Sequence, residues 1–112
     1  MAFEQETKKF IEEVKQSEVY CDYIKKKEAA MRDFKLWREI SDYKKKRFEM
    51  QNSLSGEELF DRAESFEKGY EEWKSNKVVS DYLDAELAIC RMLQEISFEV
   101  VKELDIEKQI WR

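Results

Sequence analysis

Hydrophobic residues recur at steps of three and four along almost the whole chain, which is the spacing of a helix that buries one face. Five such stripes cover residues 3–14, 20–31, 34–48, 59–73 and 78–104. The pattern predicts an all-α fold, an antiparallel helical bundle of four to five helices with a long C-terminal helix. No linker or repeat divides the chain, so we expect a single domain over residues 1–112.

Polar residues between the stripes predict where helices begin and end. Ser17 is a good N-cap, and the glycine-bearing loop Asn52–Gly56 offers Ser55 as a cap for the following helix. Asn76 can adopt the left-handed conformation that ends a helix. Asp33 is a weaker N-cap signal, and because the chain has no proline, the helix either breaks there or continues through it.

The last stripe is the widest, because apolar side chains at positions such as Val78, Leu83 and Leu87 extend it beyond one helix face. A helix apolar over so wide an arc buries more than one side, either at the centre of the bundle or against a second molecule. The residues that we expect at a protein interface are Val79, Tyr82, Ala85, Glu86, Ile89 and Leu93. The alternative is that they form the core within one chain.

The composition excludes several classes of function. With two glycines and no proline, the chain cannot build a β-sandwich, a small barrel or a glycine-cradled nucleotide site. The absence of histidine removes histidine-based triads and metal sites, and Cys21 and Cys90 are too far apart for a thiolate cluster. We therefore expect no catalytic, cofactor-binding or metal-binding residues, and hence no enzyme.

One group of carboxylates has the spacing of a metal or acid–base site. The members, three or four positions apart, are Asp61, Glu64, Glu67 and Glu71. Because they alternate with an apolar stripe, we expect them to face water, where a carboxylate keeps its ordinary pKa and catalyses little.

Charge is unevenly distributed along the chain. Residues 1–52 hold 13 basic and 11 acidic residues, a net charge of +2, whereas residues 53–112 hold 8 and 15, a net charge of −7. The basic residues that could contact RNA or an acidic partner are Lys25, Lys26, Lys27, Lys44, Lys45, Lys46 and Arg47. The overall charge of −5 makes nucleic acid an unfavourable partner, and solvated helix faces are the simpler interpretation.

The longest uncharged run, residues 50–56, is too short to span a bilayer or to serve as the apolar part of a signal peptide. We therefore expect a soluble, cytoplasmic protein without membrane insertion. The two distant cysteines fit a reducing compartment.

The final helix resembles a known family. Three of its segments are similar to the C-terminal segment of the YlbF/YmcA family of small bacterial regulators. They are Asn76-Lys77-Val78-Val79, Tyr82-Leu83-Asp84-Ala85-Glu86 and Leu93-Gln94-Glu95-Ile96. Upstream, Ser17, Tyr20 and Tyr23 match the family's Ser-x-x-Tyr-x-x-Tyr helix start. Asp33-Phe34 stands where many members carry Asp-Pro.

The resemblance, which spans about residues 8–104, implies a self-associating helical protein without known catalysis. Members control competence, sporulation and biofilm formation, and some assemble with partner proteins to modulate mRNA processing by a membrane-bound ribonuclease. Some also bind an iron–sulfur cluster through tail cysteines whose spacing Cys21 and Cys90 do not provide, so no cofactor is implied.

Our interpretation is a regulatory adaptor that acts through protein contacts as a homodimer or higher homo-oligomer, with other regulatory proteins as further partners. The alternative is an RNA-binding helical module that uses the two basic clusters. Trp111 either packs on the bundle or anchors a partner.

Overall fold

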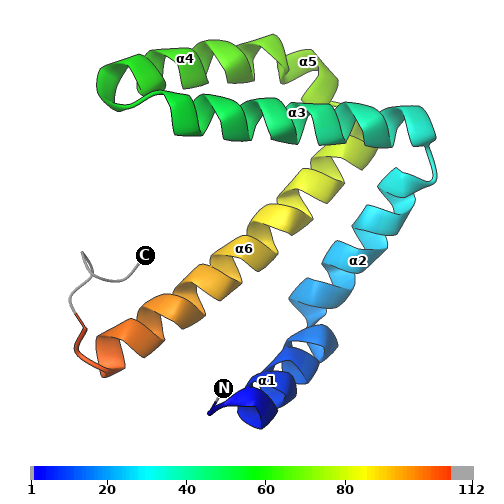
Figure 1. Cartoon of the computed structure of the whole chain (residues 1–112). Coiled ribbons are helices and arrows are strands. Elements are labelled where there is room, and N and C mark those ends of the chain that lie inside the picture. The colour runs from blue at the N-terminus through cyan, green and yellow to red at the C-terminus, as the bar shows by residue number, and fades with distance from the viewer. Residues whose placement is uncertain (1, 107–112) are drawn as a thin grey trace. The chain divides into compact units, whose positions relative to one another are not determined.

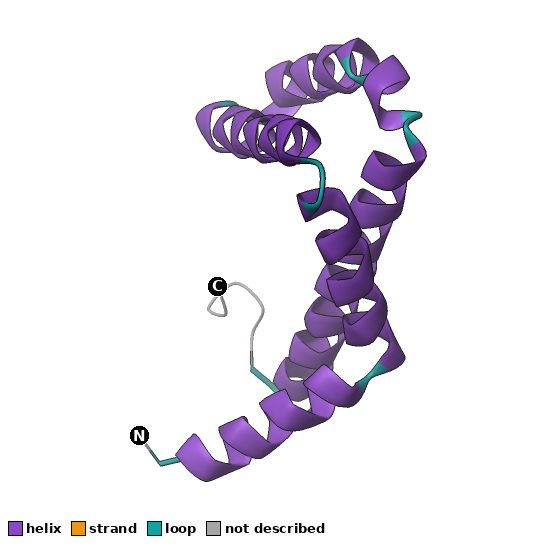
Figure 2. Ribbon diagram, turned by 90° about the vertical axis from the view of Figure 1, so that its right-hand side faces the viewer, coloured by secondary structure: helices purple, strands orange, loops and turns teal. Residues whose placement is uncertain are grey.

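The computed structural model describes residues 2–106, and these are helical except for short connections (Figures 1 and 2). Six helices follow one another: α1 (Glu4–Gln16), α2 (Glu18–Met31), α3 (Phe34–Ser53), α4 (Gly56–Gly69), α5 (Glu71–Lys74) and α6 (Lys77–Glu103). No strand occurs among the described residues. The predicted all-α class and the long last helix are confirmed, and the helix beyond the expected four or five is the single turn α5.

The chain divides into two compact units. The terminal unit comprises Met1–Ile24 and Asp84–Arg112, and the hairpin unit comprises Lys25–Leu83. The terminal unit contains α1, the start of α2 and most of α6. The hairpin unit contains α3, α4 and α5 with the remaining turns of α2 and α6. The prediction of one domain stays a prediction.

Side-chain caps separate the first three helices. The Ser17 hydroxyl oxygen accepts a hydrogen bond from the Tyr20 amide at 3.2 Å, and the hydroxyl donates to the Val14 carbonyl at 2.6 Å. Asp33 Oδ1 accepts the Leu36 amide at 3.1 Å and begins α3. Each cap satisfies an amide that a helix start leaves without a partner, so α2 and α3 are two helices.

One expected boundary role was wrong, and a second was confirmed in position but not in bonding, because Ser55 is the N-cap residue of α4. Asn76 does not end a helix in the left-handed region, because its Oδ1 accepts the amides of Val78 at 2.9 Å and Val79 at 3.4 Å and so begins α6. Ser55 makes no side-chain cap bond to α4. Instead, Gly56 enters the helix with φ of 63°, a conformation that glycine adopts without strain.

Helix α6 spans 27 residues, or about 40 Å, and it ends in a Schellman motif. The Asp105 amide donates to the Lys102 carbonyl at 3.1 Å, and the Ile106 amide donates to the Val101 carbonyl at 3.2 Å. Asp105 takes the left-handed φ of 54° that this motif requires.

The stripe at residues 59–73 does not form one uninterrupted helix. Gly69 ends α4, and Tyr70 interrupts the helix with φ of −103° and ψ of 3° before α5 begins. Glycine is a weak helix former, and the bend leaves the Tyr70 ring against other aromatic rings of the hairpin unit. Helices α3 and α4 run antiparallel beside each other, which sets the positions of these rings (Figure 1).

Candidate functional site

Tyr43 is the centre of an aromatic cluster in the hairpin unit. Its ring, only 1% exposed, stacks on Phe66 with a centroid distance of 5.5 Å. It meets Tyr70 edge-on at 4.9 Å and Trp73 at 5.1 Å. These partners come from α4, α5 and the turn between them, so the cluster fixes those elements on α3.

A polar network closes over one side of this cluster. The Tyr43 hydroxyl donates to Glu67 Oε1 at 2.9 Å, Lys74 Nζ forms an ion pair with Glu67, and the same Nζ lies 3.4 Å from the Tyr43 oxygen. Burial raises the pKa of Tyr43, and the hydrogen bond to Glu67 adds to this effect. The hydroxyl therefore stays protonated at neutral pH.

The other two members of the network are held in their charged forms. Burial opposes the charge of Glu67, but hydrogen bonds from Lys74 and Tyr43 outweigh it and lower the carboxyl pKa. Burial likewise opposes the charge of Lys74, and the bonds to Glu67 and Tyr43 raise its pKa. A neutral donor, a fixed anion and a fixed cation make a structural clamp, because none of the three is poised to exchange a proton near pH 7.

The network corrects one expectation about the carboxylates. Asp61, Glu64 and Glu71 are exposed, as expected, but Glu67 turns to Tyr43 and Lys74 instead of facing water alone. Within residues 2–106, no group of three or more metal-ligating side chains lies close enough together to hold a metal ion.

A second buried tyrosine lies where α6 begins. Tyr82 is 1% exposed, its hydroxyl accepts a hydrogen bond from Lys44 Nζ at 2.9 Å, and Trp37 meets its ring edge-on at 5.4 Å. The buried ring thus keeps its hydroxyl hydrogen-bonded, as a tyrosine in a protein interior usually does.

The six residues expected at an interface differ widely in burial. Val79, Tyr82 and Ala85 are buried within the chain, Glu86 and Ile89 are half-buried, and Leu93 is exposed. The first three therefore have no surface left for another molecule. Whether the remaining three contact a partner stays a prediction.

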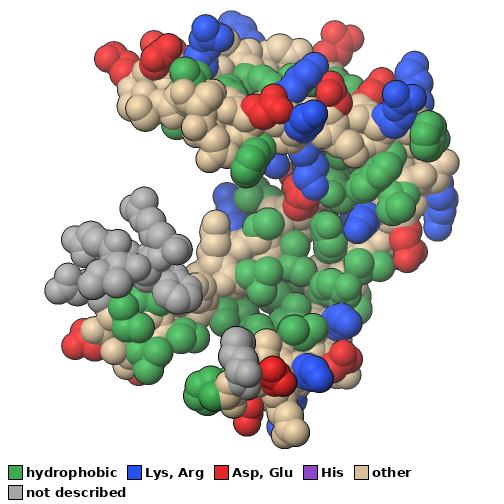
Figure 3. Space-filling model, viewed as in Figure 1, with side chains coloured by type: hydrophobic (Ala, Val, Ile, Leu, Met, Phe, Trp, Pro, Cys, Tyr) green, Lys and Arg blue, Asp and Glu red, His purple; other side chains and the backbone are tan. Residues whose placement is uncertain are grey.

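Apolar surface is concentrated on the terminal unit. Its exposed large hydrophobic side chains, among the described residues, are Phe3, Phe10, Ile11, Leu87, Leu93, Phe98, Val100, Leu104 and Ile106. Only Ala85 and Val101 of its described residues are buried hydrophobics. Figure 3 shows hydrophobic side chains gathered over the lower parts of α2 and α6. An apolar surface of this extent indicates an interaction site.

The basic cluster of α3 does not form one strip. Lys44 is hydrogen-bonded to Tyr82, Lys46 pairs with Asp42 at 3.0 Å, and the guanidinium of Arg47 lies 5.3 Å from the Tyr43 ring centroid. Four consecutive residues point about 100° apart around a helix, so they cannot all face one ligand. Lys25, Lys26 and Lys27 on α2 have the same geometry. The RNA-binding alternative stays a prediction without support from this arrangement.

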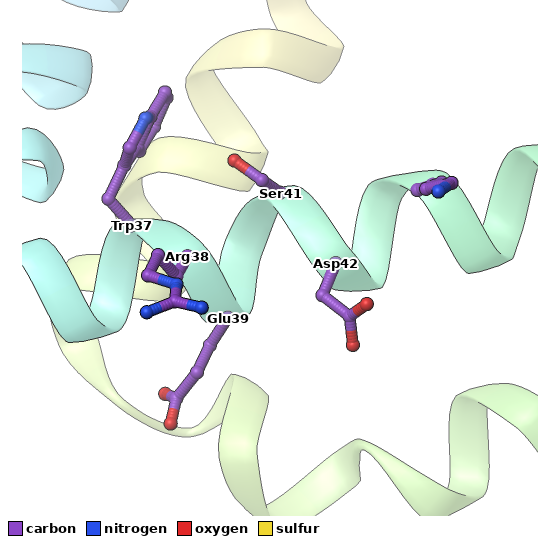
Figure 4. A pocket seen from close by; sticks show the side chains of 6 residues that line it. Trp37, Arg38, Glu39, Ser41 and Asp42 are labelled. Atoms are coloured by element: carbon purple, nitrogen blue, oxygen red, sulfur yellow. The ribbon is translucent and has the colours of Figure 1, made fainter.

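The hollow in Figure 4 lies along α3 and has a volume of about 510 Å³. Its lining residues are Trp37, Arg38, Glu39, Ser41, Asp42 and Lys45. In Figure 4 the side chains of Trp37 and Ser41 point to one side of the helix and those of Glu39 and Asp42 to the other. Side chains that diverge in this way do not converge on a reacting atom, as a catalytic site requires.

Two further findings concern the sequence-based expectations. No helix in the described part of the chain is long and apolar enough to cross a membrane. The role of Trp111 lies outside the described residues. The Tyr43–Glu67–Lys74 network was not anticipated, and no local signal indicates it, because Tyr43 is 24 positions from Glu67.

The sequence of the chain was compared with family models, with curated proteins and with solved structures. The sequence model of the family described as "Control of competence regulator ComK, YlbF/YmcA" matches residues 4–105. A protein of Caldicellulosiruptor bescii described as "UPF0342 protein" is 30% identical over 100 residues, which cover 88% of this chain and 84% of that protein. No solved structure matches.

Proposed function

Because the chain belongs to the YlbF/YmcA family of competence-control regulators, we propose that it is a non-enzymatic regulatory adaptor. It acts in the cytoplasm by binding proteins, both further copies of itself and other regulatory proteins. The processes that the family resemblance suggests are competence, sporulation, biofilm formation and mRNA processing.

The observation that carries this proposal is the uncovered apolar surface of the terminal unit. Helix α6 has hydrophobic side chains around much of its circumference, yet Leu87, Leu93 and Val100 are all exposed. Apolar area left in water is unfavourable by roughly 25 cal/mol per Å². A bound protein that covers this surface removes that cost, whereas RNA or a small polar ligand does not.

The hairpin unit supports the same proposal because, unlike the terminal unit, it covers its own apolar side chains. Its aromatic rings pack on Tyr43, and the hydroxyls of its buried tyrosines Tyr43 and Tyr82 are hydrogen-bonded to half-buried charged side chains. It therefore has a core of its own, and we assign it the role of a rigid body that the regulator presents to its partners. Glu86, Ile89 and Leu93 remain the proposed interface residues of the original six.

A genetic experiment tests the proposal. In the native host, deletion of the gene should change transformation frequency, biofilm formation or transcript processing, and the wild-type gene should restore the phenotype. A Leu93→Glu variant should fail to restore it, because a charge on the apolar surface weakens protein contacts. The matched control is Phe60→Glu, which changes an exposed side chain of the hairpin unit and should restore the phenotype.

Two outcomes would contradict the proposal. One is full restoration by Leu93→Glu at wild-type protein levels, since the apolar surface would then be irrelevant to the regulator. The other is a deletion strain without any regulatory phenotype.

A further inference from the structure

One side of α3 carries a stripe of exposed side chains at alternating steps of four and three. The members, called the α3 stripe, are Phe34, Arg38, Ser41, Lys45 and Phe48. All of them are exposed, and the two phenylalanines are 73% and 68% exposed. They lie within about 80° on the helix surface, opposite Tyr43, whose ring packs on α4. The stripe therefore points away from the core of the hairpin unit.

The two cations of the α3 stripe are not paired with carboxylates in the part of the chain that the structure describes. Neither Arg38 nor Lys45 forms an ion pair with any of these residues. The Arg38 guanidinium lies 5.8 Å from the centroid of the Phe34 ring, a contact that leaves its charge on the stripe.

Two carboxylates beside the stripe on α3 are engaged by other residues. Glu39 Oε1 accepts a hydrogen bond from Trp73 Nε1 at 3.2 Å, and Asp42 pairs with Lys46 at 3.0 Å. The two cations of the stripe therefore present positive charge to the outside, where an anion of another molecule can pair with them.

The middle of the stripe is lower than its two ends. The hollow of about 510 Å³ in Figure 4 lies there, and Arg38, Ser41 and Lys45 are among its lining residues. Because the Ser41 side chain is much smaller than a phenylalanine, a space remains between the two exposed rings. Side chains of a second helix pack into such spaces when two helices meet.

The spacing of the stripe is that of a contact between two helices. Steps of four and three keep side chains on one seam when two helices pack along each other. From Phe34 to Phe48 the stripe is about 21 Å long, or about four helical turns. A partner helix of similar length can contact all five members.

We infer that the α3 stripe binds an amphipathic, acidic helix of another protein. Apolar side chains of that helix contact Phe34 and Phe48, and its glutamates or aspartates pair with Arg38 and Lys45. This inference rests on the proposed function, in that it assigns to the adaptor a docking face on the hairpin unit and the chemistry of the partner that fits it.

Helix α4 exposes a ring among charges of the opposite sign. Phe60 is 69% exposed and lies within about 60° of the exposed Glu57 and Glu64 on the helix surface. The two helices of the hairpin thus each expose phenylalanine, one beside cations and the other beside anions. An acidic helix is attracted to the first surface and repelled by the second.

The dimensions of the stripe favour a protein helix over RNA. Its two rings are about 21 Å apart along α3, which is too far for successive bases to stack on them. Two cations neutralise few phosphates, and the whole chain has a net charge of −5.

The exposed apolar area of the stripe predicts weak and reversible binding. With about 200 Å² for a fully exposed ring, the two phenylalanines present roughly 280 Å². A standard interface buries about 800 Å² per partner. We therefore expect a transient contact, of the kind that a regulator makes and releases.

An NMR titration of the isotope-labelled full chain tests the inference with two synthetic peptides. Each is a helix of about five turns with leucine and a second residue alternating on one face, and that second residue is glutamate in one peptide and glutamine in the other. The glutamate peptide should shift the amide signals of residues 34–48. It should bind about tenfold more tightly than the glutamine peptide, which cannot form the two ion pairs.

Matched variants separate the roles of charge and rings. Arg38→Ser with Lys45→Ser should remove the difference between the two peptides, and Phe48→Ser should weaken the binding of both. Phe60→Ser, which removes an equally exposed ring from α4, should change neither. Far-ultraviolet circular dichroism checks that each variant is folded.

The outcomes separate this inference from the proposed function. If neither peptide binds, or if both bind equally to the wild-type chain, the inference is overturned, whereas the test at Leu93 still decides the proposed function. A short uridine oligonucleotide that shifts the same amides more than the glutamate peptide would assign the stripe to RNA and also overturn it. A deletion strain without a phenotype contradicts the proposed function and leaves the result of the titration unchanged.

Cross-linking in the native host tests the chemistry of the partner. The photoreactive residue benzoylphenylalanine replaces Ser41 in one strain and Glu64, on α4, in the other. Mass spectrometry should identify, at position 41 only, a segment of another protein that combines apolar and acidic residues at helical spacing. A product with this chain itself, with RNA or with a segment without carboxylates would overturn the inference, as would the absence of a product specific to position 41.

Discussion

The two units of the chain differ in how much of their apolar surface they bury. The hairpin unit buries Ile40, Tyr43, Val79 and Tyr82, and the hydroxyls of its two buried tyrosines are hydrogen-bonded to charged side chains. The terminal unit buries only Ala85 and Val101 among its described hydrophobic residues, and nine of its large apolar side chains are exposed. The hairpin unit therefore has a core of its own, whereas most of the large apolar side chains of the terminal unit lie at its surface.

Helix α6 shows the same contrast along its own length. Val79 and Tyr82, in its first two turns, are buried in the hairpin unit, whereas Leu93, Val100 and Leu104 are exposed. Val79 and Val100 are the same residue type, yet one is 0% and the other 50% exposed, so the difference lies in what packs against each turn. The apolar pattern of a helix thus does not distinguish core from interface.

The largest predicted effect comes from removal of the ring at the centre of the hairpin unit. Tyr43→Ala should lower the free energy of unfolding by about 3–5 kcal/mol, because it leaves a cavity and takes the hydroxyl donor away from Glu67. Tyr43→Phe keeps the ring and should cost only about 1 kcal/mol. Urea unfolding followed by tryptophan fluorescence measures both values, and equal losses for the two variants would contradict a packing role.

A smaller effect should follow loss of the hydroxyl at the start of α6. Tyr82→Phe should lower the free energy of unfolding by about 1–2 kcal/mol, because Lys44 loses a buried acceptor while the ring packing on Trp37 remains. Chemical denaturation measures this change. A variant as stable as wild type would show that the bond contributes nothing to the core.

Acid should weaken the hairpin unit through Glu67. Its pKa is lowered from an ordinary value of 4.5 in the folded state, so the unfolded chain binds the proton first. The stabilisation is complete above pH 4.5 and is lost as pH falls through the lower folded pKa. Since the side chain is 39% exposed, solvent screening limits the effect to about 0.5–1 kcal/mol.

The same network predicts the alkaline behaviour. The pKa of Lys74 is raised above 10.5, so its contribution to stability is complete below that value and is lost as pH rises through the folded pKa.

A Glu67→Gln variant tests the acid prediction, because it should flatten the dependence of the unfolding free energy on pH at the acid end. An unchanged acid slope in that variant would assign the effect to another carboxylate.

The smallest effect is expected on the exposed side of the terminal unit. Leu87→Ser should change the free energy of unfolding by less than about 0.5 kcal/mol, because the side chain is half exposed and contributes little packing within the chain. Thermal unfolding at two protein concentrations measures this. A loss of more than 2 kcal/mol would show that Leu87 belongs to a core.

Local signals in the sequence predicted most of the fold. Ser17 is predictable as a helix start because a cap acts on amides only two or three residues away, whereas Asp33 gives a weaker signal that leaves a continuous helix open. Asn76 was assigned to the wrong end of a helix, because asparagine is favourable both after one helix and before the next. The long last helix followed directly from its apolar periodicity.

The site was harder to predict because it depends on contacts between distant residues. The break at Tyr70 accompanies the packing of its ring on Tyr43, 27 positions away. Glu64, Glu67 and Glu71 look equivalent in the sequence, and only the packing of α4 on α3 brings Glu67 to Tyr43. In the same way, the pattern of α6 does not show which turns the chain itself covers.

Hydrogen–deuterium exchange at two protein concentrations tests the central claim most directly, because it reads both units in one experiment. The account predicts that amides of α1 and of residues 89–103 become more protected as the concentration rises from nanomolar to high micromolar, while those of α3 and α4 do not change. Protection that is independent of concentration in α1 and α6, or that changes equally in both units, would contradict it.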